Sequence, residues 1–228
     1  DITGTLGMGH TRWATHGEPN DTNAHPHYSE DNGLAIIHNG IIENYDVIKR
    51  DLLSKGYTFR TDTDTEVLCY LIDDIRKKTG LKLGESVRNA LRQVVGAYAI
   101  VVMSEEEPDK LIAARKSSPL VVGIGKEGDF YLASDATPFV EYTKSVVYLG
   151  DEEIVVIKRD AGMKIYDIDD AEKTPYIHEL ELHLEQIEKG GYEHFMLKEI
   201  HEQPRSIEDC FRGRLNAAKG RVALGGIK

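Results

Sequence analysis

The stretch VRNALRQVVGAYAIVVMS, residues 87–104, contains the point at which the periodicity of the sequence changes. Apolar side chains recur at helical spacing up to about residue 94, and residues 97–104 then form an almost continuous apolar run. Such a run is typical of a buried strand. Helical segments before this point and strand-like segments after it predict an α+β fold rather than alternating βαβ units.

Before this boundary the sequence predicts a strand over residues 33–40, which ends in an Asn-Gly turn. A helix should follow, with Asn44 as its N-cap and Gly56 just beyond its end. The apolar face expected for this helix is formed by Val47, Ile48, Leu52 and Leu53.

Residues 57–61, YTFRT, predict a further strand. The segment DTDTEVLCYLIDDIRKK, residues 62–78, has apolar residues at helical spacing and acidic residues in its first turn, where the helix dipole favours them. A third helix is expected near residues 84–94. Its apolar side is formed by Val87, Ala90, Leu91 and Val94.

After residue 96 short apolar runs alternate with Gly, Pro or Asp, and we interpret them as consecutive strands of antiparallel sheet. The runs cover residues 97–104, 110–115, 120–125, 129–134, 146–150, 152–159 and 163–168. From about residue 170 the chain becomes charged and largely helical. Gly190-Gly191 is a plausible hinge, so we expect a domain over residues 1–189 and a separate segment over residues 190–228.

Composition excludes several classes of protein. The net charge of −11 and the lack of a basic cluster before the tail argue against nucleic-acid binding. No apolar run approaches the length of a membrane-spanning helix. Two cysteines, Cys69 and Cys210, are too few for a disulfide framework, which favours a cytoplasmic location.

Residues 10–27, HTRWATHGEPNDTNAHPH, contain four of the nine histidines and suggest a metal site. Two features argue against one: no pair has the helical i, i+4 spacing, and no cysteine lies nearby. His25 and His27 flank a proline in an extended stretch, so their rings should point to opposite faces. The alternative is that these histidines, with His38, make hydrogen bonds within loops.

The sequence contains no convincing nucleophile, because Cys69 lies within a predicted helix, where a buried and inert thiol is expected. A ligand site is a further possibility. Arg12 offers a planar fork for a carboxylate, Asp64 can bind an ammonium group, and Asn39-Gly40 offers an amide and an accessible backbone N–H. These groups could recognise a free amino acid. Each also has a simpler explanation, as a surface charge, a helix N-terminus and a turn.

Four motifs taken together resemble the glutaminase domain of the class II amidotransferases. They are HTRWATHG (10–17), NAHPH (23–27), HNGIIENY (38–45) and TDTDTEV (61–67). The resemblance implies the four-layer αββα sandwich of N-terminal-nucleophile hydrolases. It also implies that a cysteine at the mature N-terminus attacks the amide of glutamine, with its own α-amine as the base.

The resemblance also implies roles for individual residues. The substrate-binding residues would be Arg12, Trp13, Thr15, His16 and Asp64, and the catalytic residues would be Asn39 and Gly40. Arg12 would hold the α-carboxylate of glutamine, and Thr15 and His16 would help from the same loop.

In the same resemblance, Asp64 would hold the α-ammonium group of glutamine. Asn39 and Gly40 would form the oxyanion hole through a side-chain amide and a backbone N–H. Trp13 would close the site as part of a mobile loop. No metal and no cofactor are implied.

The resemblance implies L-glutamine as substrate, and it implies a homodimer when the protein is complete. The segment KEIHEQP, residues 198–204, is similar to the link into a sugar-phosphate isomerase domain. We therefore expect residues 1–189 to be a glutaminase domain and residues 190–228 to be the linker and the beginning of that second domain.

Neither Cys69 nor Cys210 matches the position of the family's nucleophile, so we expect a fold truncated at its N-terminus and a polypeptide that is inactive by itself. Three alternatives stay open. The chain could be a non-catalytic amino-acid-binding or assembly module, the glutaminase domain of another class II amidotransferase, or a histidine-dependent metallohydrolase.

Overall fold

The computed structural model describes residues 4–180, 189–211, 215–216 and 221–222. The chain divides into two compact units, Asp1–Leu180 and Glu181–Lys228. The boundary predicted after residue 189 stays a prediction. Among the described residues, no helix is long and apolar enough to cross a membrane.

A seven-stranded antiparallel sheet forms the centre of the first unit. Its strands, in spatial order, are β1 (His27–Tyr28), β2 (Leu34–Ile42), β3 (Gly96–Ser104), β4 (Lys110–Lys116), β8 (Glu153–Lys158), β9 (Gly162–Asp167) and β10 (Glu172–Lys173). The strand predicted over residues 97–104 is therefore confirmed as β3, which pairs with β2 along its whole length.

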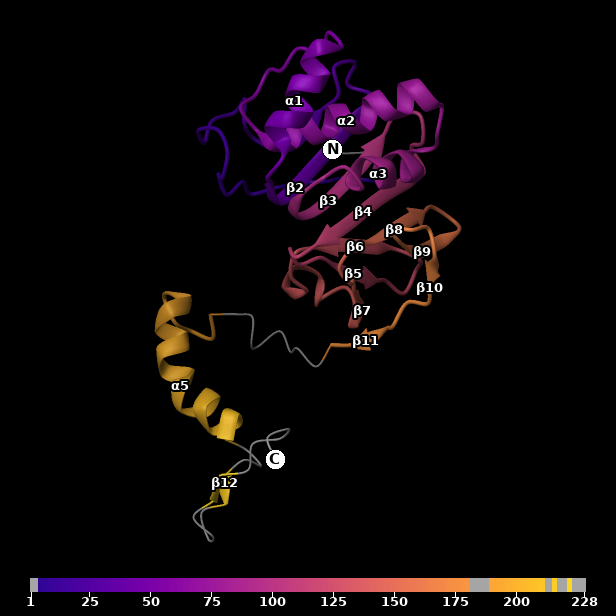
Figure 1. Cartoon of the computed structure of the whole chain (residues 1–228). Coiled ribbons are helices and arrows are strands. Elements are labelled where there is room, and N and C mark those ends of the chain that lie inside the picture. Colours follow the sequence, from indigo (N-terminus) through magenta and orange to yellow (C-terminus); the bar gives the residue numbers. More distant parts are fainter. Residues whose placement is uncertain (1–3, 181–188, 212–214, 217–220, 223–228) are drawn as a thin grey trace. The chain divides into compact units, whose positions relative to one another are not determined.

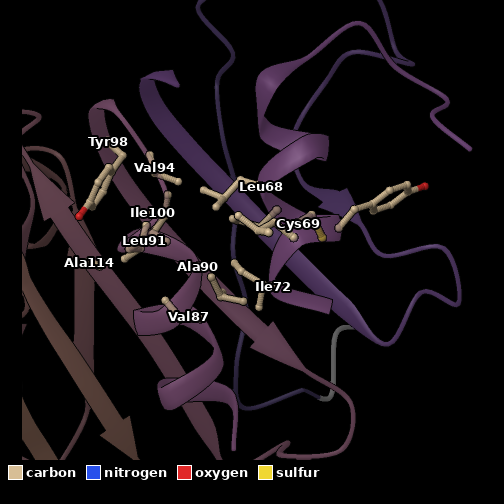
Figure 2. Packing of buried hydrophobic residues seen from close by; sticks show 14 of the residues in the cluster. Leu68, Cys69, Ile72, Val87, Ala90, Leu91, Val94, Tyr98, Ile100 and Ala114 are labelled. Atoms are coloured by element: carbon tan, nitrogen blue, oxygen red, sulfur yellow. The ribbon is translucent and has the colours of Figure 1, made fainter. Parts of the chain in front are cut away.

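Three helices cover one face of this sheet (Figure 1): α1 (Tyr45–Ser54), α2 (Asp64–Thr79) and α3 (Leu83–Leu91). Leu68 and Ile72 of α2, Val87 of α3 and Ile100 of β3 belong to one buried cluster between the helices and the sheet (Figure 2). Because α2 is buried along most of its length, its first turn is held firmly against β2.

A second sheet packs against the other face. Its strands are β11 (His178–Glu179), β7 (Ser145–Tyr148), β5 (Val121–Ile124) and β6 (Phe130–Ala133). Val122 and Val147 of this sheet share a buried cluster with Val101 and Val155 of the first. Beyond it lies the short 3₁₀ helix η1 (Thr137–Phe139), so the described residues form a helix layer, two sheets and a thin outer layer. The predicted α+β class is confirmed.

The second unit contains the helix α5 (Phe195–Phe211) and a short hairpin of β12 (Leu215–Asn216) and β13 (Arg221–Val222). The helical character predicted for the charged tail is therefore confirmed for residues 195–211. Gly190 and Gly191 both have positive φ, which glycine adopts at little cost.

The strand predicted over residues 57–61 is wrong. The N–H groups of Arg60 and Thr61 donate to the carboxylate of Glu66, at 2.9 and 2.8 Å, instead of to a neighbouring strand. The sequence has the composition of a strand, but its backbone donors are used to begin α2.

The predicted details of α1 and α3 also need correction. Only Ile48 and Leu52 of the expected apolar face are buried, whereas Val47 and Leu53 are exposed by 61% and 50%. Asn44 occupies the N-cap position without capping the helix. Its amide instead bonds to the backbone of residues 93 and 95, which ties α1 to the start of β3. The helix α3 ends at Leu91, three residues earlier than predicted.

Candidate active site

The first turn of α2 forms the floor of the candidate site. Thr63 is the N-cap, and its hydroxyl accepts a hydrogen bond from the backbone N–H of Glu66 at 3.2 Å. This bond is one of the two that make up a capping box. The Glu66 carboxylate does not make the second one and instead accepts hydrogen bonds from the preceding loop. Asp64 and Thr65 are consequently fixed in the first helical turn, where the helix dipole stabilises a carboxylate.

Asp64 is 3% exposed and connects this turn to β2. Its Oδ2 accepts a hydrogen bond from the backbone N–H of Ile42 at 2.8 Å, and His38 Nδ1 lies 4.0 Å from the same oxygen. Within the described part of the chain, the other oxygen, Oδ1, has a single long contact of 3.5 Å, with the Thr65 hydroxyl. One carboxylate oxygen therefore holds the helix turn to β2, and the second is bonded more weakly.

Three histidines lie next to this turn. His25 Nε2 and His38 Nδ1 each lie 3.0 Å from the Thr65 hydroxyl, and His27 Nε2 lies 3.1 Å from the Thr63 hydroxyl. The rings of His25 and His27 contact each other, with centroids 4.8 Å apart. The prediction that they point to opposite faces is wrong, because both reach hydroxyls of the same helical turn.

His25, His27 and His38 are uncharged at neutral pH. Burial is the largest cause that lowers the pKa of His25 to about 2, and the neighbouring His10 and His27 contribute to the same shift. Burial also lowers the pKa of His27 to about 4, although the Glu66 carboxylate opposes this. Burial lowers the pKa of His38 despite the nearby Asp64. The described residues contain no group of three or more His, Cys, Asp or Glu side chains arranged to hold a metal ion.

The loop that carries Arg12 folds back on itself. Arg12 has a positive φ of 55°, its backbone N–H donates to His10 Nδ1 at 2.9 Å, and its guanidinium donates to the His16 carbonyl at 2.7 Å. The Arg12 Nε is buried and has no hydrogen-bond partner within the described part of the chain. A buried N–H without a partner is costly, so the Arg12 Nε is an unsatisfied donor among the described residues.

A pocket of about 560 Å³ opens beside this loop. Its polar lining includes His10, Trp13, His38 and Asn39, and its walls come from both sheets. The apolar wall residues are Ile37, Ala99, Val101, Leu120, Leu132, Ala133 and Pro138. Trp13 lines this pocket and is 90% exposed. Thr15 is also exposed.

Asn39 and Gly40 lie within the last four residues of β2, and Asn39 lines the pocket. Asn39 Oδ1 is 2.7 Å from His10 Nε2. Gly40 has a φ of +125°, and a Cβ on it would lie 2.2 Å from the carbonyl oxygen of Ala97 in β3. Only glycine fits there, so the backbone has a conformation that other residues do not adopt.

The structure therefore gathers several of the residues singled out from the sequence. Asn39 and Trp13 line one pocket, and the backbone N–H of Arg12 donates to His10, which also lines it. Asp64 lies in the first turn of α2, where its Oδ2 is 4.0 Å from Nδ1 of His38, a further lining residue. His10 and Thr65 had no individual role in the sequence-based interpretation. Their contacts join residues 29 and 40 positions apart, and no local pattern signals such contacts.

Comparison with known proteins shows the family of the chain. A family model described as "Glutamine amidotransferase domain" matches residues 2–167. This match covers more than half of the chain, so the chain belongs to the family of glutamine amidotransferase domains. Among solved structures, glutamine phosphoribosylpyrophosphate amidotransferase from B. subtilis, complexed with ADP and GMP, is 32% identical with a TM-score of 0.57. The match covers 70% of this chain and 34% of that one, and it confirms the N-terminal-nucleophile type of fold.

Curated relatives identify the branch of the family. The glutamine–fructose-6-phosphate aminotransferase (isomerizing) of Bacteroides thetaiotaomicron is 57% identical over 227 residues, which are all of this chain and 37% of that protein. The protein of the same name from Chlorobaculum tepidum is 54% identical over 98% of this chain and 36% of its own length. The chain thus spans little more than a third of the relatives it matches.

Proposed function

We propose that this chain is the glutaminase part of a glutamine–fructose-6-phosphate aminotransferase, also called glucosamine-6-phosphate synthase. It would release ammonia from L-glutamine for the conversion of fructose 6-phosphate to glucosamine 6-phosphate. The observation that carries this proposal is that Asn39 of β2 and His10 and Trp13 of the loop that contains Arg12 line one pocket, with His10 bonded to both Asn39 and the Arg12 backbone. The 57% identity to an aminotransferase of that name supports the choice of branch.

Each polar group of glutamine has a counterpart in the site. The α-carboxylate would bind Arg12, whose buried Nε has no partner within the described residues. The α-ammonium would bind the more weakly bonded oxygen of Asp64, and Thr15 and His16 would complete the contacts from the loop. The side-chain amide carbonyl would then face the Asn39 side chain and the Gly40 N–H, which stabilise the negative oxygen formed when the carbonyl carbon is attacked.

We propose that neither cysteine of this chain supplies the attacking thiolate. Cys69 is buried in α2, and burial raises the pKa of its thiol well above the ordinary value. Cys210 lies in α5, outside the unit that carries the site. We therefore propose that residues 1–228 alone do not hydrolyse glutamine and that the nucleophile belongs to another part of the complete protein.

The proposed partners follow from the same assignment. They are L-glutamine, a fructose-6-phosphate isomerase domain in the same longer chain, and a second copy in a homodimer. We propose a cytoplasmic location, and no cofactor enters the proposed reaction. Another class II amidotransferase is favoured less, because the phosphoribosylpyrophosphate enzyme is only 32% identical over 70% of the chain.

Replacement of Arg12 by lysine in the full-length protein tests the proposed binding mode. Lysine keeps the charge but loses Nε and the planar fork, so the KM for glutamine should rise about 10- to 100-fold, the range for a lost charge-assisted hydrogen bond. The control is Arg50→Lys, since Arg50 is exposed on α1. If Arg12→Lys leaves the KM unchanged in a steady-state assay of glutamate release, the assignment of Arg12 is wrong.

A further inference from the structure

The hydrogen bonds around His10 define the orientation of the Asn39 amide. The Arg12 backbone N–H can only donate, and it points at His10 Nδ1 from 2.9 Å. The Nδ1 atom therefore presents its lone pair, and the proton of the neutral ring lies on Nε2. The donor Nε2–H is 2.7 Å from the Asn39 side chain, so the atom that it meets must be the acceptor Oδ1.

This orientation has a consequence for the pocket. When Oδ1 is taken by His10, the Nδ2 group of Asn39 is turned away from the imidazole. The structure gives Nδ2 no protein partner among the described residues, and Asn39 lines the pocket. An amide with the opposite orientation would present an oxygen there and repel a developing oxyanion. The ring of His10 also contacts that of His25, with centroids 4.3 Å apart, so the imidazole is supported from one side.

We propose that His10 is a positioning residue, which holds the Asn39 amide in the one orientation that can stabilise an oxyanion. This inference rests on the proposed glutaminase function. The hydrogen bonds of His10 also connect the loop of Arg12 with β2, because they run from the Arg12 backbone through His10 to Asn39. The turn at Arg12, with its positive φ, aims the N–H at His10 as well as folding the guanidinium back onto the loop.

A matched pair of substitutions separates this role from a general structural one. His10→Gln retains an N–H donor for Asn39 Oδ1, whereas His10→Glu offers only acceptors and should turn the Asn39 amide around. We expect kcat for glutamine hydrolysis by the full-length protein to be about 10²- to 10³-fold lower for His10→Glu than for His10→Gln, as for the loss of one oxyanion donor. The KM for glutamine should stay within about threefold, because this donor acts in the transition state.

The added charge of glutamate could itself lower the rate, so the pair is repeated in an Asn39→Ala background. If His10 acts through Asn39, the difference between the two variants disappears there, since coupled residues are not additive. A difference that persists would overturn the proposal, as would equal kcat values in the wild-type background. A change confined to KM would also contradict it.

A measurement that does not depend on activity completes the test. Nitrogen-15 NMR of the full-length protein with labelled histidine should find the Nε2–H tautomer at His10, and the Nδ1–H tautomer would overturn the proposal. The two hypotheses fail in different ways. Absence of glutamate release by the wild-type protein refutes the proposed function, whereas a normal wild-type rate with equal Gln and Glu variants refutes only the role of His10.

Discussion

Substitution of Gly40 by alanine should change both the stability of the fold and the activity of the site. Gly40 lies in β2 opposite Tyr98 of β3, and its φ is +125°. An added Cβ would lie 2.2 Å from the Ala97 oxygen, 2.8 Å from the Ala97 carbonyl carbon and 3.0 Å from Tyr98 Cα. All three atoms are backbone, so no side chain can move aside, and β2 must shift relative to β3.

Two costs add at this position. A backbone conformation that only glycine adopts costs about 1–3 kcal/mol in other residues. Overpacking against a rigid neighbour costs about 1–3 kcal/mol more. The expected loss is therefore about 2–6 kcal/mol in the free energy of unfolding, a large part of the roughly 5–15 kcal/mol of a typical domain. Because the Gly40 N–H would move with the strand, kcat should also fall about 10²- to 10³-fold.

The assay combines urea unfolding with glutamate release by the full-length protein. Gly96→Ala is the matched control for stability, because its Cβ would lie 2.1 Å from the Ile41 oxygen in the same strand pair and its φ is +130°. It should be destabilised as much as Gly40→Ala but lose less than about tenfold in kcat per folded molecule, since Gly96 is not an oxyanion donor. Gly56→Ala has positive φ and no atom within 4 Å, so it should cost only about 1–2 kcal/mol.

The reasoning would be refuted by a Gly40→Ala protein that unfolds within about 1 kcal/mol of wild type, since a positive φ alone should cost more. It would also be refuted if Gly40→Ala and Gly96→Ala lost equal activity per folded molecule. In that case the kcat effect would come from the distortion of the sheet and not from the Gly40 N–H.

Two further predictions concern buried groups. The pKa of His27 is lowered from 6.5 to about 4, so on acidification the unfolded chain binds a proton at a higher pH than the folded protein does. The contribution of His27 to the free energy of unfolding should therefore be complete above pH 6.5 and fall by about 3 kcal/mol as the pH decreases to 4. Urea unfolding against pH should show a shallower profile for His27→Asn, and parallel profiles would contradict this account. Iodoacetamide should modify the exposed Cys210 in the native protein and reach Cys69 only after unfolding. Mass spectrometry that finds native Cys69 alkylated would contradict its burial.

The sequence predicted well which segments are helices and which are strands, because periodicity is a local signal. The change of period near residue 94 correctly separated the helices α1 to α3 from the strands β3 to β9, and each apolar run in that second segment is a strand. Which sheet each strand joins could not be predicted. The strand β4 pairs with β8 and skips β5, β6 and β7, and such pairing depends on contacts between distant segments.

The incorrect predictions near the site also arise because the structure there depends on specific contacts that no local pattern signals. Residues 57–61 have the composition of a strand, but a carboxylate six residues from Arg60 takes the backbone donors. The histidines resembled a metal site in composition, yet they contact the Thr63 and Thr65 hydroxyls, and burial lowers the pKa values of His25 and His27. The roles of Arg12 and Asn39 came from resemblance to a family, whereas the hydrogen bonds of His10 could be read only from the three-dimensional structure.

The most direct test of the central claim is the steady-state rate of glutamate release by the full-length protein with Asn39→Ala. If Asn39 and Gly40 form the oxyanion hole of a glutaminase, kcat should fall about 10²- to 10³-fold and the KM for glutamine should stay within about threefold. An unchanged kcat would contradict the account, and so would a loss that lies entirely in KM.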